Sequence, residues 1–352
     1  MDWDDFEDLN FDEEENLDDE LFRNLEEEKE EPFFMVRHKS MFFPASLKKG
    51  DKIAIISPAS VVKDEYVYGA MARMRERGYE PVLMKYALGH EDGNFAASKA
   101  DRLMDLFDAL ENSEFKAIFC TRGGYGCSQL LANFSYGMVA KNPKWLIGFS
   151  DVSALLAMWY SSDIASIHGP MAKHLATKPA DDPSTVALFE MLENGGRFDY
   201  TVAPHEYNRL GKTTGVIRGG NMAVLTDLAG TAYDLFDAMR DYNDDGIILF
   251  FEDIAEPIYK INRMLWRLIL SGSLPIVKGI IFGQFTEYKP DKNFRTMEDM
   301  IKHFMDRSIV PPHIPVVYNF PVGHTDLNYP ITEGAKVELD VKETTVRLRT
   351  IF

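Results

Sequence analysis

The stretch KWLIGFSDVSALLAMWY, residues 144–160, decides the fold class. Its first part is a short apolar run of the kind found in a buried strand, and residues 152–160 read as an apolar helix. Between them stands the turn Gly148-Phe149-Ser150. A strand, a sharp turn and a helix make up a nucleophile elbow, which presents a serine at a helix N-terminus. The second glycine of the usual G-x-S-x-G pattern is absent, which leaves open that Ser150 is only the N-cap of the helix.

Upstream of this stretch the sequence repeats the alternation of strand and helix. Apolar runs predict strands at 52–56 and 117–120, and helices are predicted at 64–77 and after Ser98, which forms a capping-box pattern with Asp101. Alternating strands and helices imply a mainly parallel sheet that is covered on both faces. We therefore predict an N-terminal α/β domain over residues 41–175 that carries the nucleophile.

The pattern changes after residue 175. Residues 176–212 are polar and rich in turn signals, and we predict an irregular connecting segment there. Beyond it the sequence predicts strands at 246–251, 279–285 and 316–320, a helix near 261–270, and a hairpin of 336–341 with 345–349. Residues 213–352 are thus predicted to form a β-rich α+β domain, with the site in a cleft between the two domains.

The acidity of the chain is concentrated at its N-terminus. The 352 residues include 38 Lys and Arg and 56 Asp and Glu, for a net charge of −18. Residues 1–31 hold 17 of the acidic and two of the basic residues, so the rest of the chain has 39 acidic and 36 basic residues, a net of −3. Such acidic blocks are usually disordered, and residues 1–40 are predicted to be a disordered tail. Aromatic residues among the acids leave a partner-binding segment as the alternative.

Composition also limits the compartment and the partners. An acidic chain repels nucleic acid and anionic lipid, so neither is expected as a partner. No apolar run approaches the roughly 18 residues of a membrane helix, and the opening MDWDDFEDLN does not resemble a signal peptide. Two cysteines, Cys120 and Cys127, do not make a disulfide framework. We predict a cytoplasmic protein.

Three other features could carry chemistry. The turn Arg122-Gly123-Gly124-Tyr125-Gly126 could bring backbone N–H groups close to an anion or could be a plain βα turn, and it lacks the lysine of a phosphate-binding loop. Glu252 follows the apolar run 246–251, where a carboxylate is either an exposed cap or aimed into a site. Of the eight histidines, His324 and His168 have the context of a base, and none has the spacing of a zinc protease.

Taken in order, these blocks resemble the LD-carboxypeptidase family of serine peptidases, which includes the microcin C immunity proteins. The matching blocks are RGGYG at 122–126, GFSD at 148–151, HGPM at 168–171, GGN at 219–221, FEDIAEP at 251–257 and VGH at 322–324. The resemblance covers about residues 50–341. It implies an N-terminal α/β domain and a β-rich C-terminal domain, a catalytic triad assembled across the cleft, often in a homodimer, and no metal or organic cofactor.

The resemblance also implies roles for single residues. Ser150 aligns with the nucleophile, Glu252 with the triad acid and His324 with the base. This accords with the chemistry, because a serine needs a base within reach and the base needs a third group to orient it. The backbone N–H groups of Gly124 and Asp151 correspond to an oxyanion hole. Substrate-binding candidates are Arg122, Arg218 and Asn221, although Arg218 could equally be an ordinary surface arginine.

The family's best-known reaction is the removal of the terminal D-alanine from murein tetrapeptides during cell-wall recycling. Immunity relatives instead cleave peptidyl or aminoacyl nucleotides and tend to carry an extra substrate loop, for which the 311 residues after position 41 leave little room. We therefore expect a murein peptide as substrate. Two alternatives are a non-catalytic binding protein whose tail recruits a basic partner, and a cysteine hydrolase that uses Cys127 at a helix start, where a thiolate is favoured.

Overall fold

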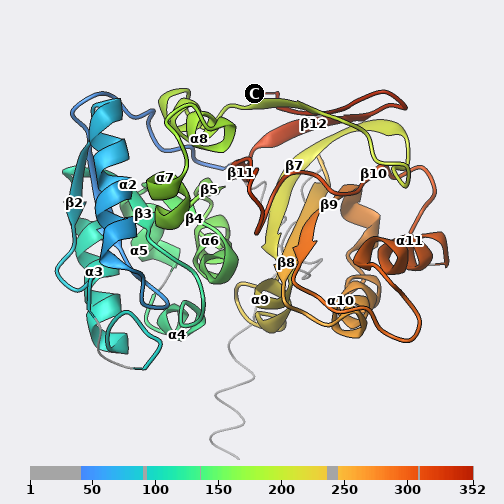
Figure 1. Ribbon diagram of the computed structural model, residues 1–352, viewed down its shortest axis with the longest axis horizontal. Coiled ribbons are helices and arrows are strands. Elements are labelled where there is room, and N and C mark those ends of the chain that lie inside the picture. The colour runs from blue at the N-terminus through green and yellow to red at the C-terminus, as the bar shows by residue number, and fades with distance from the viewer. Residues whose placement is uncertain (1–40, 90–92, 135, 236–244, 308–309, 352) are drawn as a thin grey trace, which may run out of the picture. The chain divides into compact units, whose positions relative to one another are not determined.

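Two β-sheets, one built mainly from each half of the chain, form the core of this protein (Figure 1). The structure is a computed structural model that describes residues 41–351, except 90–92, 135, 236–244 and 308–309. The predicted tail, residues 1–40, lies outside the described residues. Within the described part of the chain, no helix has both the length and the apolar character needed to cross a bilayer.

The first sheet has six strands in the order β11-β5-β4-β3-β1-β2. Its strands are β1 (Lys52–Ile56), β2 (Glu80–Leu83), β3 (Phe115–Cys120), β4 (Trp145–Gly148), β5 (Ser166–His168) and β11 (Ile331–Glu333). The five N-terminal strands pair in parallel, as predicted. The edge strand β11 comes from the C-terminal half and pairs antiparallel with β5. The chain therefore returns to its first sheet late in the sequence.

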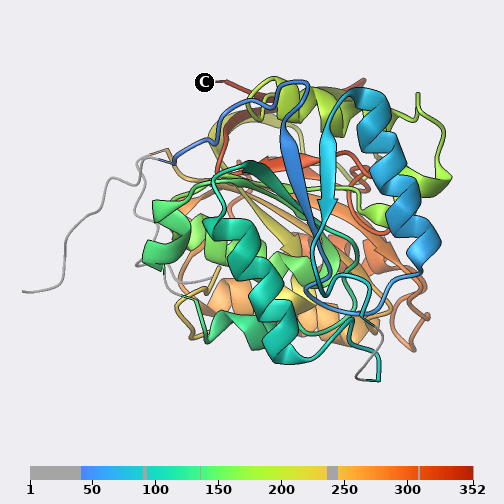
Figure 2. The same ribbon diagram turned by 90° about the vertical axis from the view of Figure 1, so that its left-hand side faces the viewer.

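Helices cover both faces of this sheet because the strands are apolar on both sides. Helices α2 (Asp64–Arg77) and α3 (Lys99–Glu111) lie on opposite sides of β1 (Figure 2). Ile53 and Ile55 of β1 share one cluster with α2, whereas Ala54 and Ile56 share the other with α3. The predicted ends of these helices are confirmed. Gly78 ends α2 at φ +100°, and the Ser98 hydroxyl accepts a hydrogen bond of 3.2 Å from the N–H of Asp101. The remaining helices of this half are α4 (Ser128–Leu131), α5 (Tyr136–Lys141), α6 (Ser153–Ser161), α7 (Ala172–Thr177) and α8 (Pro183–Glu193).

The second sheet has seven strands in the order β10-β9-β8-β7-β12-β13-β6. They are β6 (Asp199–Val202), β7 (Gly211–Asn221), β8 (Ile247–Ile254), β9 (Val277–Thr286), β10 (Val316–Val317), β12 (Lys336–Val341) and β13 (Val346–Thr350). Strands β7 to β10 pair in parallel, and β12, β13 and β6 complete the sheet antiparallel. Helices α9 (Met222–Asp227), α10 (Ile258–Leu270) and α11 (Met297–Arg307) belong to this half. The predicted hairpin and the α+β character of this half are confirmed.

Two predictions of local structure are wrong. Residues 176–212 are not irregular, because they contain α8 and β6. Asp182-Pro183 starts α8: the Asp182 carboxylate accepts from the N–H of Thr185 at 2.9 Å, and proline is well suited to the first turn of a helix. The strand predicted at 316–320 is only Val316–Val317, since the chain turns at Asn319, which has φ +53°.

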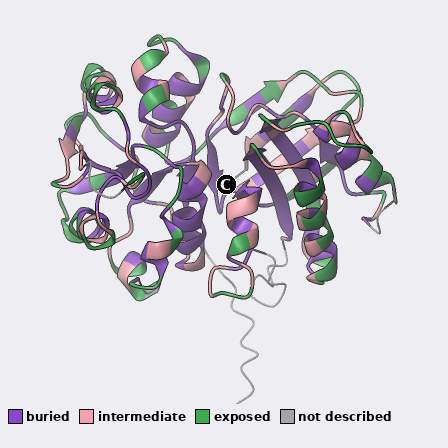
Figure 3. Cartoon of the chain, turned by 60° about the horizontal axis from the view of Figure 1, so that its bottom comes forward, coloured by how far each residue is buried: buried purple, intermediate pink, exposed green. Residues whose placement is uncertain are grey.

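The arrangement of the strands places the site. Strands β4 and β5 are fully buried, β8 is buried except at Ile254, and β7 is buried over residues 215–221 (Figure 3). Ser150 follows the carboxyl end of β4, while His168, Asn221 and Glu252 lie at or near the carboxyl ends of β5, β7 and β8. The carboxyl ends of parallel strands are where ligands bind in open α/β sheets.

Candidate active site

Ser150 lies in a strained turn, and its hydroxyl points toward His324. It has φ +63°, a left-handed conformation that serine rarely adopts, and it is the first residue of the short 3₁₀ turn Ser150–Val152 that follows β4. The turn is tight: a Cβ on Gly148 would lie 2.8 Å from Cγ1 of Val152, and one on Gly123 would lie 2.8 Å from Cβ of Ser150. Glycines at 123 and 148 are therefore required for this geometry, which is that of an elbow and not of a plain N-cap.

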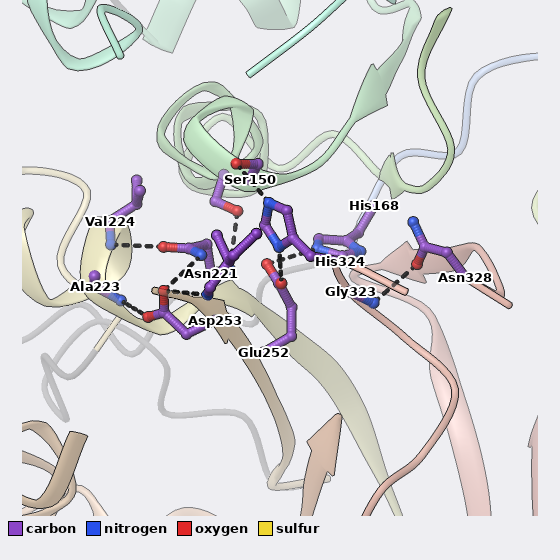
Figure 4. A network of polar contacts seen from close by, with 12 residues as sticks. Ser150, His168, Asn221, Ala223, Val224, Glu252, Asp253, Gly323, His324 and Asn328 are labelled. Carbon is purple, nitrogen blue, oxygen red and sulfur yellow. Dashed lines mark hydrogen bonds and ion pairs between the residues drawn. The ribbon is translucent and has the colours of Figure 1, made fainter. Parts of the chain in front are cut away.

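A chain of two hydrogen bonds runs from Ser150 across to the second sheet (Figure 4). Nε2 of His324 lies 3.0 Å from Oγ of Ser150, and Nδ1 of His324 lies 2.7 Å from Oε2 of Glu252. The side chain of Glu252 is fully buried, and that of His324 is 16% exposed. Phe149 packs against the imidazole, with ring centroids 4.8 Å apart. The structure thus brings together the three residues that the sequence singled out, from positions 150, 252 and 324.

Close backbone packing aims the Glu252 carboxylate at His324. Glu252 lies inside β8, opposite a bulge in β9: between the pairs Phe251–Phe282 and Asp253–Phe285, this one residue of β8 faces two residues of β9. Bulges of this kind change the direction in which a side chain points. Gly323 has φ +115°, and a Cβ there would lie 2.7 Å from Cβ of Glu252. The segment before His324 can approach Glu252 only because position 323 is glycine.

The charges of the pair are strongly coupled. Burial alone would raise the pKa of Glu252, but the nearby His324 charge, the hydrogen bond from His324 and the adjacent His168 outweigh it and lower that pKa to about 2. For His324 burial acts in the opposite direction and would lower the pKa, but the Glu252 carboxylate outweighs burial and raises the pKa of His324. The site therefore holds an ionised glutamate that stabilises positive charge on the imidazole.

The glycine-rich turn lies directly against the serine turn. Gly124 has φ +107° and rests on Ser60, whose hydroxyl accepts from the N–H of Tyr125 at 3.1 Å. The Asp151 carboxylate accepts from the N–H of Cys127 at 2.9 Å, which ties the two turns together. Among the described residues, none accepts a hydrogen bond from the N–H of Gly124 or from that of Asp151. Both groups remain available to a ligand.

Asn221 has a structural role in the fold. Its Oδ1 accepts from the N–H of Val224 at 3.1 Å, which caps α9, and its Nδ2 donates to Asp253 at 3.1 Å. Asp253 also accepts from the N–H of Ala223 at 2.8 Å. Burial, together with the neighbouring Glu252 charge, raises the pKa of Asp253 to about 7. Asp253 also belongs to this network, and the sequence did not predict it. Of the adjacent pair Glu252-Asp253, only Glu252 was a candidate site residue.

The two candidate arginines lie in different surroundings. Arg122 is exposed and donates a hydrogen bond to the carbonyl of Val61. Arg218 is not a surface arginine, since it is only 3% exposed and its guanidinium carbon lies 3.8 Å from the centre of the Tyr160 ring. Its charge also acts on the buried Glu333 of β11, whose pKa burial raises to about 8 in spite of the arginine.

Comparison with known proteins decides the family. Residues 53–169 match the N-terminal domain of the LD-carboxypeptidase family, and residues 214–339 match its C-terminal domain. The chain belongs to the LD-carboxypeptidase family. It is 30% identical over 305 residues to a probable murein peptide carboxypeptidase of Bacillus subtilis, covering 86% of this chain and 92% of that protein.

Further relatives span two named activities within the family. The crystal structure of muramoyltetrapeptide carboxypeptidase from Oxalobacter formigenes has a TM-score of 0.72 at 28% identity, covering 85% of this chain and 98% of that one. The microcin C7 self-immunity protein MccF of Escherichia coli is 25% identical over 332 residues, covering 84% of this chain and 92% of that protein. The resemblance inferred from the sequence blocks is thus confirmed, as is the organisation into two family domains.

The cysteine alternative is wrong for this LD-carboxypeptidase. Cys127 is fully buried, and burial with the adjacent Asp151 raises the pKa of its thiol well above the ordinary value. A thiol that is neither exposed nor ionised cannot attack a substrate. As for metals, the described residues contain no cluster of three or more His, Cys, Asp or Glu side chains that could hold an ion.

Proposed function

We propose that this protein is a cytoplasmic serine carboxypeptidase that hydrolyses the L,D-amide bond to the terminal D-alanine of murein tetrapeptides in cell-wall recycling. The observation that carries the proposal is the hydrogen-bonded chain Ser150–His324–Glu252 in a member of the LD-carboxypeptidase family. Relatives named for murein peptides and muramoyl tetrapeptides support the choice of substrate.

In this proposal the three residues act as a catalytic triad. Oγ of Ser150 attacks the carbonyl carbon on the L-centre side of the bond while Nε2 of His324 takes its proton. The C–N bond then breaks, and His324 returns the proton to the amine of the leaving D-alanine. Water, with its proton taken by His324, hydrolyses the resulting ester and restores Ser150. Glu252 holds Nδ1 of His324 and stabilises the imidazolium in both steps.

We assign the oxyanion hole to the backbone N–H groups of Gly124 and Asp151. Each step places negative charge on the carbonyl oxygen, and donors held in place by the backbone stabilise that charge without reorganising. Both N–H groups lack an acceptor among the described residues, and both belong to turns that pack on Ser150.

A carboxypeptidase must also bind the terminal carboxylate, and Arg122 is our candidate for it. Arg122 is exposed and precedes Gly123, which packs against Ser150. Arg218 is a weaker candidate because its guanidinium is buried against Tyr160. An Arg122→Gln substitution should reduce kcat/KM on the acid substrate about 100-fold, because a charge-assisted hydrogen bond is lost. It should change the already low rate on an amidated peptide little.

The decisive experiment compares matched synthetic tetrapeptides. The L,D-linked peptide should release D-alanine, whereas its L,L isomer and its C-terminally amidated form should be spared. Inverting the last centre exchanges the directions of its methyl and carboxylate groups, and a cation left unpaired by the wrong isomer costs several kcal/mol. Equal rates on the L,D and L,L peptides would contradict the proposal.

The immunity-type reaction is the second candidate, because the chain also covers most of MccF. Activity confined to an aminoacyl-adenylate analogue in the same assay would move this protein to that branch. We also propose a homodimer, which sedimentation at several concentrations would test, with no nucleic acid as partner.

A further inference from the structure

A second histidine lies against the triad acid. Nε2 of His168 is 3.7 Å from Oε1 of Glu252, the carboxylate oxygen that His324 does not use (Figure 4). This distance is longer than a hydrogen bond, but it is within ion-pair range. Glu252 therefore has an imidazole beside each of its two oxygens.

Neither Oε1 of Glu252 nor the His168 ring has a hydrogen-bond partner in the part of the chain that the structure describes. Both side chains are fully buried, and no described residue forms a hydrogen bond with Oε1 of Glu252 or with either ring nitrogen of His168. A buried, ionised carboxylate oxygen without a donor is costly. An N–H at Nε2 of His168 that points toward Oε1 offsets part of this cost, and charge–dipole interactions are strong where water is excluded.

The surroundings hold His168 in this orientation. It pairs with Gly148 of β4 on one side and with Ile331 of β11 on the other. Its ring meets Phe149 and Phe250 edge-on, with centroids 5.7 and 5.2 Å away. Since the ring is fully buried, it cannot touch a substrate. Whatever it does for the reaction must act through Glu252.

We propose that His168 is a positioning residue that fixes Oε1 of Glu252, so that the carboxylate is held between two histidines with Oε2 facing Nδ1 of His324. This role requires the N–H of His168 to affect the charge of the Glu252–His324 pair. The N–H of His168 stabilises the form in which Glu252 is ionised and His324 is neutral, which is the form that can activate Ser150. The other charged groups that face the pair are Asp253 on β8 and Glu287 just after β9.

The test is the pKa of His324, measured by ¹⁵N-histidine NMR on the full chain, with His324→Gln used to assign the signal. Without the donor at position 168, the Glu252–His324 pair should take up a proton more readily, so His168→Leu should raise the pKa of His324. His168→Gln places an amide N–H where Nε2 stood and should restore the wild-type value. If the leucine variant does not fold, His168→Asn serves, because its shorter amide does not reach Oε1.

Kinetics give a second reading, which depends on the proposed function. His168→Leu should lower kcat on the order of 10- to 100-fold, because a displacement of about 1 Å in a catalytic group can cost on the order of 100-fold in rate. KM should be unchanged, and the acid limb of the pH profile should move to higher pH. His174→Gln is the matched control: His174 also faces a carboxylate, Asp182, at 2.7 Å with both side chains largely buried, and its loss should leave kcat and the limb unchanged.

The outcomes separate the two proposals. An unaltered pKa of His324 in His168→Leu, or the same loss of kcat in the glutamine and leucine variants at every pH, would overturn the positioning role and leave only packing. If the wild-type protein does not cleave the tetrapeptide but the His168 variants show the expected changes in the pKa of His324, the proposed substrate is refuted and the role of His168 is retained.

Discussion

If the hydroxyl of Ser150 is the nucleophile, its removal should stop the reaction and leave the fold unchanged. We expect Ser150→Ala to lower hydrolysis on the order of 10³-fold or more, the usual scale for loss of a triad nucleophile. The thermal unfolding temperature should change little, because the substitution leaves the strained backbone of the turn as it is. Cys127→Ala is the control, since that thiol is fully buried. Near-normal turnover in the serine variant would exclude Ser150 as the nucleophile.

In the proposed mechanism, the charge of Glu252 sets the pH range in which His324 acts as a base. Its carboxylate raises the pKa of His324, so kcat/KM should rise with pH through a limb above the ordinary histidine value of 6.5. Glu252→Gln removes that charge while burial, which lowers the pKa, remains. The limb should therefore move to lower pH, and kcat should fall about 10⁴-fold, as when a triad carboxylate becomes an amide.

Asp253 is the control for this pH profile, because its own pKa of about 7 lies in the same range. Asp253→Asn should leave the limb near its wild-type position, since Glu252 acts on His324 more strongly than Asp253 does. A limb that vanishes in Asp253→Asn and persists in Glu252→Gln would assign it to Asp253 instead.

At the scale of elements, the approach of the chain before His324 to β8 depends on one glycine. Gly323→Ala would place a Cβ 2.7 Å from Cβ and 2.8 Å from Oε2 of Glu252, so the carboxylate or the histidine must move. A displacement of about 1 Å can cost on the order of 100-fold in rate. We expect a loss of kcat of that size. Gly272→Ala shares a positive φ, +76°, but has nothing within 4 Å, and it should keep full activity with a similar loss of stability. Equal kcat values in the two variants would contradict this account.

The elements that the sequence predicted well are those whose signals are local. The alternation of apolar runs in β1, β3 and β4 and the caps at Gly78 and Ser98 need no knowledge of distant residues. Residues 176–212 were misread because Asp182-Pro183 marks a turn and a helix start equally well, and only the packing of α8 decides between them. The pairing of β11 with β5 has no local signal, since it joins positions 166–168 to positions 331–333.

In the site, too, some features have a local sequence signal and others depend on residues far apart in the chain. Ser150, Glu252 and His324 were candidates from their local sequence blocks, and the resemblance to the LD-carboxypeptidase family gave each of them its expected role. Their distances, and the side on which His168 stands, depend on β4, β5 and β8 meeting across two sheets. His168 was visible only as a competitor for the base, since a sequence cannot show that a histidine is fully buried behind the acid.

At the scale of the whole molecule, the proposed triad, oxyanion-hole and substrate-binding residues all lie between positions 122 and 324, while most of the net charge lies in residues 1–31. Deletion of residues 1–31 should therefore leave kcat and the unfolding temperature unchanged while it removes 15 of the 18 net negative charges. Steady-state kinetics and thermal unfolding of the truncated and full-length chains test this. A full-length variant with the acids of residues 1–31 changed to Asn and Gln separates charge from chain length. Loss of kcat on truncation but not on neutralisation would show that the segment itself belongs to the working enzyme.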